Sequence, residues 1–469
     1  MIFSFLYFVL FLLMVLFVYY VVPVELQHGW LLLTSYVFCL TYGCKSLCIL
    51  LCSTLISYLF GILLDKVKNA YPQSKSMLVC LWCGIVFCVF PLLFGRINQN
   101  SLFAGIGISF YLLQQIGYLV DIYRGKIRAE RKLVRYSLFV AFFPKLISGP
   151  IERSDNLLRQ IDEMSERTFD YGKVKSGLML MLWGYFQKIM IADSLSFFVT
   201  NVYDHWEGYA GGTLWLASIV FAFQLYADFS GYTNIAMGAA QVLGFHLQQN
   251  FEQPYLAVSI KEFWRRWHIS LSSWLRDYVY IPIGGSKKGE IRYYINLMIT
   301  FMVSGVWHGI GLNFAAWGML HGFFQVVESF FLKRRQEVIE ETAFRKTLKR
   351  IWIFILVDFA WIFFRASGLK TALNIVYKII FHFAADEMVR DIGVSLCLNT
   401  VQVIIGILSI LLLLVVDVLH EKGISVRIFI SRQPIMIRWM CYISIVLLFA
   451  LAGARRWGTE ASNFIYTQF

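Results

Sequence analysis

The sequence predicts an all-α polytopic membrane protein with roughly 10–12 transmembrane helices. Of its 469 residues, 58% are hydrophobic and only 15% are charged, whereas soluble globular chains carry about 25% charged residues. The mean hydropathy is +0.63. Apolar segments recur along the chain, and a spanning helix needs about 20 apolar residues. This composition excludes a disordered chain, which has too few large apolar residues to fold.

The apolar segments divide the chain into candidate spans. They occupy residues 1–24, 29–43, 46–64, 77–94, 101–120, 176–200, 212–228, 232–249, 293–308, 312–332, 351–364, 371–384, 397–419 and 435–453. The first has no charged residue and no basic leader, so we interpret it as a retained span rather than a signal peptide. We expect one membrane-embedded domain over residues 1–469, with a catalytic core at approximately 220–330.

Some of these segments, and residues 136–149, are too short to cross a bilayer alone. Such segments are typical of re-entrant or amphipathic helices. Irregular backbone is tolerated at membrane depth only where it is buried in protein or lines a wet cavity. The sequence therefore predicts an internal cavity.

The charged residues give a net charge of +13. Basic residues gather at 124–135 and 333–350, which we place in the cytoplasm because short cytoplasmic loops carry an excess of Lys and Arg. The sequence shows no nucleic-acid-binding module. We therefore expect contact with membrane lipid and no nucleic-acid partner.

Residues 260–277 have the pattern of one interfacial amphipathic helix. Its apolar arc carries Trp267, and its basic face carries Arg265, Arg266 and Arg276. His268 lies on the border between the two faces. The helix is either a membrane-surface strut or a surface for an anionic substrate such as the phosphates of a coenzyme A thioester.

His308 ends an apolar segment, and Gly309 and Gly311 follow it. An ionisable residue at membrane depth is by default a functional candidate. The low dielectric disfavours imidazolium, which leaves a lone pair for general-base catalysis. Ser304 lies one turn earlier on the same face. The alternative is a core histidine that hydrogen-bonds a backbone carbonyl.

Two further residues have both a structural and a functional interpretation. His321 lies on a helix with Gly318 and Gly322, a small-residue face that more often indicates close helix packing. Asp228 precedes Gly231, where we expect a break between two apolar segments. Its carboxylate either pairs with a nearby arginine or lines a substrate channel.

Common catalytic signatures are missing from the sequence. It contains no G-x-x-x-x-G-K-[ST], no H-E-x-x-H and no G-x-S-x-G pattern. No dense set of Cys, His and carboxylate residues has metal-ligand spacing. We therefore expect no bound cofactor and no metal.

Several short motifs run in order through the whole chain. They are Phe143-Pro-Lys-Leu-Ile-Ser-Gly-Pro150, Gln224-Leu-Tyr-Ala-Asp-Phe-Ser-Gly-Tyr232, Phe263-Trp-Arg-Arg-Trp-His268, Trp307-His308-Gly309, Trp317-Gly-Met-Leu-His321-Gly322 and Phe464-Ile-Tyr-Thr-Gln-Phe469. In their joint order and spacing they resemble the membrane-bound O-acyltransferase (MBOAT) family, in particular its bacterial branch that acts on alginate, peptidoglycan and teichoic acid.

The resemblance implies a ring of helices around a central funnel. It also implies that His308 is the catalytic histidine and that His268 is the second polar position. Members of this branch move an acyl group, thought to come from acetyl-CoA, to an extracytoplasmic polysaccharide, and a separate SGNH-type acetyltransferase often completes the transfer. We expect a multi-pass protein of the inner (cytoplasmic) membrane. Its donor channel is expected to include Asp228, Arg265, Arg266, Trp267, Arg276, Ser304, Trp307, Asn313 and His321.

Two departures concern the acceptor polymer. Thr467 stands where Phe is more usual, and the chain is short between about residues 85 and 105. Three alternatives stay open: transfer of D-alanyl groups to teichoic acid, polysaccharide transport, and a scaffold without catalysis. A transporter usually shows an internal repeat, and we find none in the sequence. A scaffold would tolerate His308→Gln.

Overall fold

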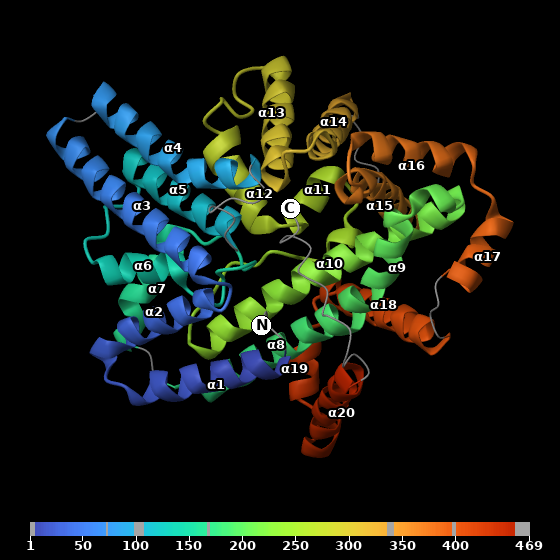
Figure 1. The fold of residues 1–469 in the computed structure, drawn as a ribbon, viewed down its shortest axis with the longest axis horizontal. Coiled ribbons are helices and arrows are strands. Elements are labelled where there is room, and N and C mark those ends of the chain that lie inside the picture. Colours follow the sequence, from blue (N-terminus) through green and yellow to red (C-terminus); the bar gives the residue numbers. More distant parts are fainter. Residues whose placement is uncertain are drawn as a thin grey trace. The chain divides into compact units, whose positions relative to one another are not determined.

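The fold is that of a computed structural model, which describes residues 5–71, 74–97, 107–166, 169–334, 342–395 and 400–454 (Figure 1). Within these ranges the protein is built from helices and contains no β-strand, which confirms the all-α prediction. The motif at residues 464–469 and residues 98–106, which include the end of the region that the sequence marks as short, lie outside the described residues.

The helices follow one another along the chain with short connections. The main ones are α1 (Phe5–Val21), α2 (Val24–Leu40), α3 (Cys44–Ala70), α4 (Lys75–Ile97), α5 (Ile108–Arg124), α6 (Leu133–Ala141), α7 (Ser154–Asp162), α8 (Tyr171–Tyr185), α9 (Asp193–Asp204), α10 (Gly211–Val242), α11 (Ile260–Arg266), α12 (Ile269–Leu275), α13 (Glu290–His308), α14 (Leu312–Arg334), α15 (Ala343–Arg365), α16 (Leu369–Phe381), α17 (Ala385–Ser395), α18 (Thr400–Glu421), α19 (Val426–Ser431) and α20 (Ile435–Ala454).

The chain divides into two compact units. The first contains Met1–Met181 and Thr233–Gln249, and the second contains Leu182–Tyr232 and Asn250–Phe469. All the residues that the sequence analysis selected for the site belong to the second unit. That the whole chain acts as a single domain with its catalytic core at 220–330 stays a prediction.

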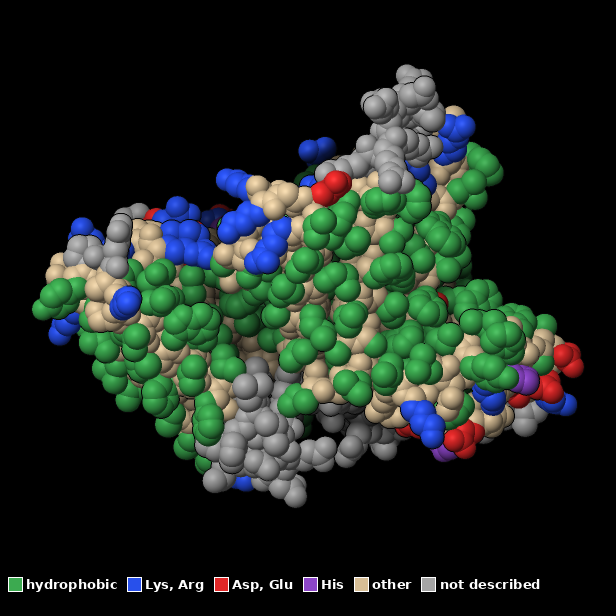
Figure 2. Space-filling view, turned by 90° about the horizontal axis from the view of Figure 1, so that it is seen from above, with side chains coloured by type: hydrophobic (Ala, Val, Ile, Leu, Met, Phe, Trp, Pro, Cys, Tyr) green, Lys and Arg blue, Asp and Glu red, His purple; other side chains and the backbone are tan. Residues whose placement is uncertain are grey.

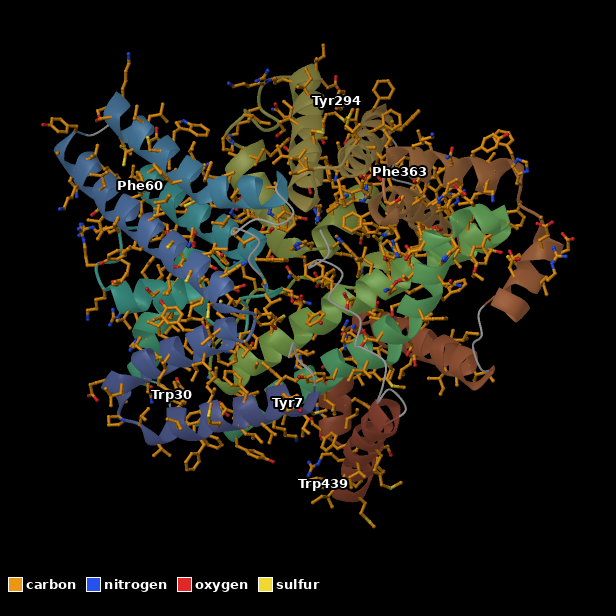
Figure 3. All side chains as sticks on the ribbon, viewed as in Figure 1. Tyr7, Trp30, Phe60, Tyr294, Phe363 and Trp439 are labelled. Atoms are coloured by element: carbon orange, nitrogen blue, oxygen red, sulfur yellow. The ribbon has the colours of Figure 1, made fainter. Side chains whose placement is uncertain are left out.

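In the first unit, α3, α4 and α5 pack side by side (Figure 1). Phe60 of α3, labelled in Figure 3, stacks on Phe87 of α4 with 5.7 Å between ring centroids. Leu55, Leu59 and Leu63 of α3 are exposed. A surface of this kind is expected of a helix that faces lipid rather than water.

Exposed apolar side chains are frequent in both units, and Figure 2 shows them over most of the face that it draws. By length and composition, three helices in the described part of the chain can cross a membrane: Cys44–Ala70, Gly211–Val242 and Ile404–Glu421. Shorter apolar helices lie at Leu6–Val21, Lys75–Phe90 and Ile435–Ser444. The protein is thus a multi-pass membrane protein that combines full-length and shorter apolar helices.

The segment 136–149, which we expected to be too short to span, forms α6 and a series of turns that are buried throughout. In these turns Lys145 is buried, and its ammonium group donates to Gln114 Oε1 at 2.5 Å and to the Val140 carbonyl at 2.9 Å. The irregular backbone therefore lies within protein, as membrane depth requires.

One expected helix boundary is wrong. The segments 212–228 and 232–249 do not form two helices, because α10 runs without a break from Gly211 to Val242. Gly231 instead permits close packing, since a Cβ atom there would lie 2.8 Å from the Gly184 carbonyl oxygen. A glycine inside a helix can thus indicate close approach of another backbone rather than a helix end.

Candidate active site

The site is built around the α13–α14 hairpin, which carries His308 and His321. The two helices approach closely because each presents a glycine to the other. A Cβ atom at Gly305 would lie 2.3 Å from the Phe314 carbonyl oxygen, and one at Gly318 would lie 2.3 Å from the Phe301 carbonyl oxygen. The small-residue face predicted around His321 is therefore a packing face, and His321 is held within it.

His308 is the last residue of α13, and the helix ends at Gly309 as the sequence indicated. The imidazole is 4% exposed, and Ser304, one turn earlier, is 1% exposed. Asn313, at the start of α14, donates its amide to the carbonyls of Phe363 and Ala366 at 3.2 and 3.1 Å. Asn313 thus fixes the hairpin to the end of α15 and serves to position His308.

The single amphipathic helix predicted for residues 260–277 is wrong. It is two seven-residue helices, α11 and α12, with the π-helical turn Arg276–Tyr280 after them. His268 separates α11 from α12 and has φ 44°, in the left-handed region. The helical wheel could not show this break, because neither glycine nor proline marks it.

The loop after α10 holds the break at His268 in place. The carbonyl of Asn250 accepts a hydrogen bond from the Ile269 amide at 2.9 Å. Its side-chain Oδ1 accepts another from the Ser270 amide at 3.2 Å. Asn250 thus accepts hydrogen bonds from the first two amides of α12. It acts as an N-cap residue although it belongs to a separate loop.

Both predicted catalytic histidines pack against Trp307. The ring centroid of Trp307 is 4.7 Å from that of His308 and 6.1 Å from that of His268. His268 also meets the edge of Phe229 at 4.6 Å. The tertiary structure therefore brings together two histidines that belong to different sequence motifs.

Burial keeps His268 neutral. The imidazole is 1% exposed, and its desolvation lowers the pKa to about 3. A neutral ring has one donor and one acceptor nitrogen. In this form His268 can orient or polarise a carbonyl group at physiological pH.

A second aromatic group surrounds the other face of His308. The ring of Trp317 lies 5.0 Å from His308 and 5.1 Å from His321, and it stacks on Trp361 at 5.7 Å. Trp267 is buried and lies 5.1 Å from Trp361. Sequence reasoning missed Trp361 altogether, because one tryptophan in an apolar segment carries no pattern.

Asp228 is paired with a lysine and not with an arginine. Lys188 Nζ lies 2.8 Å from Asp228 Oδ1 and 2.7 Å from Asp193 Oδ1. Lys188 belongs to a π-helical segment, Phe186–Ala192, between α8 and α9. No sequence pattern indicates this partner, because Lys188 lies forty residues before Asp228. Asp228 thus belongs to a buried ion-pair group.

The basic residues of α11 have different surroundings. Arg266 donates to Glu262 at 2.5 Å and to Glu421 at 2.6 Å. Arg350 also binds Glu421, at 3.1 Å. Arg265 is exposed. Arg276 is paired with the neighbouring Asp277 at 2.8 Å, and its side chain is also largely exposed. Arg266 therefore serves an ion-pair network, which leaves Arg265 and Arg276 as the accessible arginines among the three that the sequence selected.

Among the described residues, no three His, Cys, Asp or Glu side chains come together in a way that could hold a metal ion. The chemistry that the arrangement itself offers is that of two buried histidines with aromatic walls. Such a site can move a proton and exclude water from a reacting bond.

Comparison with known proteins finds relatives that are named for the transfer of acyl groups. The chain is 35% identical over 407 residues to a probable alginate O-acetylase of Azotobacter vinelandii, which covers 82% of this chain and 78% of that protein. It is 31% identical over 408 residues to a peptidoglycan O-acetyltransferase of Helicobacter pylori, with 78% and 75% covered. A teichoic acid D-alanyltransferase of Bacillus subtilis is 27% identical over 295 residues, with 59% and 74% covered.

The model of the membrane-bound O-acyltransferase family matches residues 126–369. This range contains both histidine motifs, the α13–α14 hairpin and Trp361. The match covers more than half of the chain, and the relatives named above extend it towards both ends. This chain therefore belongs to the membrane-bound O-acyltransferase family.

Proposed function

We propose that this protein transfers an acetyl group from cytoplasmic acetyl-CoA to a hydroxyl group of an extracytoplasmic polysaccharide, within the inner membrane. The observation that carries the proposal is that His308 and His268 both pack against Trp307. The family supplies acyl transfer as the reaction. Relatives named for alginate and peptidoglycan O-acetylation support acetyl as the group and a polysaccharide as the acceptor.

In this mechanism His308 is the general base. Its imidazole takes the proton of the acceptor hydroxyl while the hydroxyl oxygen attacks the thioester carbon. The C–S bond then breaks, the electron pair stays on sulfur, and the proton passes from His308 to form the free thiol of CoA. General-base catalysis of this kind contributes typically about 10²–10⁴-fold. Alignment in a site that excludes water supplies the remainder.

His268, which also packs against Trp307, orients the donor. Because its ring is buried and neutral, it can donate one hydrogen bond to the thioester without a charge. The phosphates of CoA meet Arg265 and Arg276, the two accessible arginines of this region. Arg266 has a different role, which is to hold α11 to Glu421 of α18.

The final acceptor is an exopolysaccharide or a cell-wall polymer. The hydroxyl that takes the acetyl group belongs either to that polymer or to an SGNH-type acetyltransferase outside the membrane, which then passes the group to the polymer. A D-alanyl donor is the second candidate, favoured by the similarity to teichoic acid D-alanyltransferases. Both reactions use the same base and the same attack on a thioester, so the site alone serves either group.

The test is release of free CoA by the purified protein in lipid nanodiscs with radiolabelled acetyl-CoA and a polysaccharide acceptor extract. Three proteins are compared: wild type, His308→Ala and His205→Ala. His205 is exposed, and its ring hydrogen-bonds to the Asn201 carbonyl one turn earlier, so it is the matched control. We expect turnover by wild type and His205→Ala and none by His308→Ala.

Equal turnover by His308→Ala and wild type would overturn the assignment of His308. No turnover with acetyl-CoA, together with turnover of a D-alanyl thioester, would replace acetyl by D-alanyl. Polysaccharide modification that survives His308→Gln in cells would favour the scaffold.

A further inference from the structure

Three hydrogen-bond donors beside His308 lack an acceptor. They are the indole N–H groups of Trp317 and Trp361 and the Nε2 atom of His321, and their side chains are at most 1% exposed. Within the described part of the chain, none of these atoms has a hydrogen-bond partner. Buried donors in native proteins are nearly always satisfied, so each exception needs an explanation.

The hydrogen on His321 is placed by its neighbour Trp264. The indole Nε1 of Trp264 lies 3.3 Å from Nδ1 of His321. An indole N–H can only donate, so Nδ1 of His321 must be the acceptor and carry a lone pair. The neutral ring therefore carries its hydrogen on Nε2. His321 is a donor at the position where it has no partner.

The three donors belong to one cluster, which we call the donor cluster: Trp317, His321 and Trp361. Ring centroids are 5.1 Å apart for Trp317 and His321, 5.7 Å for Trp317 and Trp361, and 6.0 Å for His321 and Trp361. Trp317 also meets His308 at 5.0 Å in an edge-to-face arrangement. Donors without acceptors thus accumulate next to the proposed base.

The donor cluster is held rigidly, which suits it to stabilise a transition state. Trp317 and His321 share α14, which packs tightly on α13 through Gly305 and Gly318. Trp361 comes from α15, stacks on Trp317 and packs against Trp267 in a tilted arrangement. Donors that are fixed before the reaction stabilise developing negative charge without reorganisation.

We propose that the donor cluster is the oxyanion site, in which Trp317, Trp361 and His321 donate hydrogen bonds to the acyl carbonyl oxygen. This inference rests on the proposed function and specifies its site. When the acceptor oxygen attacks, the π pair of the C=O bond moves onto the carbonyl oxygen, and the proton moves to His308. When the C–S bond breaks, the pair on oxygen re-forms C=O and the sulfur leaves with its own pair. The cluster holds the oxygen through both steps and exchanges no proton.

The test removes single N–H groups. Trp317→Phe and Trp361→Phe each delete one donor, and Trp274→Phe is the matched control. Trp274 is also buried and packs on Tyr278, outside the cluster. Removal of one oxyanion donor typically lowers kcat by about 10²–10³-fold. We expect that loss in kcat with little change in KM for acetyl-CoA, because the bonds strengthen in the transition state.

Two further measurements separate the lost hydrogen bond from lost packing. Replacement of Trp361 by benzothienylalanine keeps the ring shape and removes only the N–H, and it should reproduce the loss in kcat. Infrared difference spectra of bound acetyl-CoA labelled with ¹³C at the carbonyl should show a stretch at lower frequency than in water. That shift should shrink in Trp317→Phe and Trp361→Phe.

The possible results distinguish failure of the oxyanion site from failure of the proposed function. Turnover by Trp317→Phe and Trp361→Phe equal to that of Trp274→Phe would overturn the oxyanion site, while wild-type turnover would leave the proposed function standing. If the carbonyl stretching frequency is the same in Trp317→Phe, Trp361→Phe and wild type, water satisfies the donors. That result would also overturn the inference. A wild-type protein that turns over neither acetyl-CoA nor a D-alanyl thioester would overturn both.

Discussion

Gly318 of α14 lies against the backbone of Phe301 of α13, so closely that a Cβ atom at residue 318 would be 2.3 Å from the Phe301 carbonyl oxygen. Because that atom is backbone, it cannot move aside as a flexible side chain could. The contact sets the distance between the helix that carries His308 and the helix that carries His321.

Gly318→Ala should therefore separate α13 from α14. We expect a loss of about 1–3 kcal/mol in stability, as for other overpacked sites, and a strong loss of turnover because His308 and Trp317 move apart. Thermal unfolding in detergent and CoA release measure the two effects. Gly368→Ala is the control, since no atom lies within 4 Å of a Cβ at that glycine. Equal unfolding temperatures for the two variants would contradict the close contact.

The hydrogen bond from Trp264 to His321 gives a spectroscopic prediction. In wild type, ¹⁵N NMR of labelled histidine should show the hydrogen of His321 on Nε2. Trp264→Phe removes the donor, worth about 0.5–1.5 kcal/mol, so both tautomers should become populated and turnover should fall up to about tenfold. Trp274→Phe should leave the His321 signal unchanged. A single tautomer in Trp264→Phe would show that another group fixes the ring.

His268 gives a prediction of pH dependence. Its pKa is about 3 in the folded protein because of burial, against about 6.5 in an unfolded chain. Below pH 6.5 the unfolded chain binds a proton that the folded protein does not bind. Stability is therefore lost as the pH falls from 6.5 towards 3, by about 2 kcal/mol at pH 5.

The variant His268→Asn should lose this pH dependence, and asparagine tolerates the left-handed backbone at φ 44°. Unfolding temperatures of wild type and His268→Asn at pH 7.5 and pH 5 measure the difference. An identical drop in both proteins would show that other groups cause it.

The two neighbouring arginines of α11 should behave differently. Arg265→Gln should raise KM for acetyl-CoA, more so at low salt, and leave the unfolding temperature unchanged, because Arg265 is exposed. Arg266→Gln should lower stability by about 1–3 kcal/mol, because Glu262 and Glu421 lose charge-assisted hydrogen bonds.

Lys261→Gln makes an equal change of charge on the same helix. It controls for the long-range electrostatic field of the protein. Michaelis constants and thermal unfolding of the three variants give the comparison. A rise in KM that is the same for Arg265→Gln and Lys261→Gln would mean that Arg265 makes no specific phosphate contact.

The sequence determined a large part of this architecture. Apolar segments located most helices, and Gly309 after His308 correctly marked the end of α13. Hydrophobicity is a local property of a segment, so it predicts which stretches become helices and which faces meet lipid. The ordered motifs also identified the family, which the comparisons confirm. The role of glycine was harder to predict. Gly231 was expected to mark a helix break, but it permits close packing inside the continuous helix α10.

Only the tertiary structure decided which residues meet. Lys188 joins Asp228 from a π-helical segment, and Asn250 supports the left-handed turn at His268 from a separate loop. Trp361 of α15 reaches Trp317 and His321 although no motif includes it. Periodicity records that a side chain is buried but not which partner buries it. The sequence by itself therefore supplied the two histidines, and the packing of α11, α13, α14 and α15 supplied their surroundings.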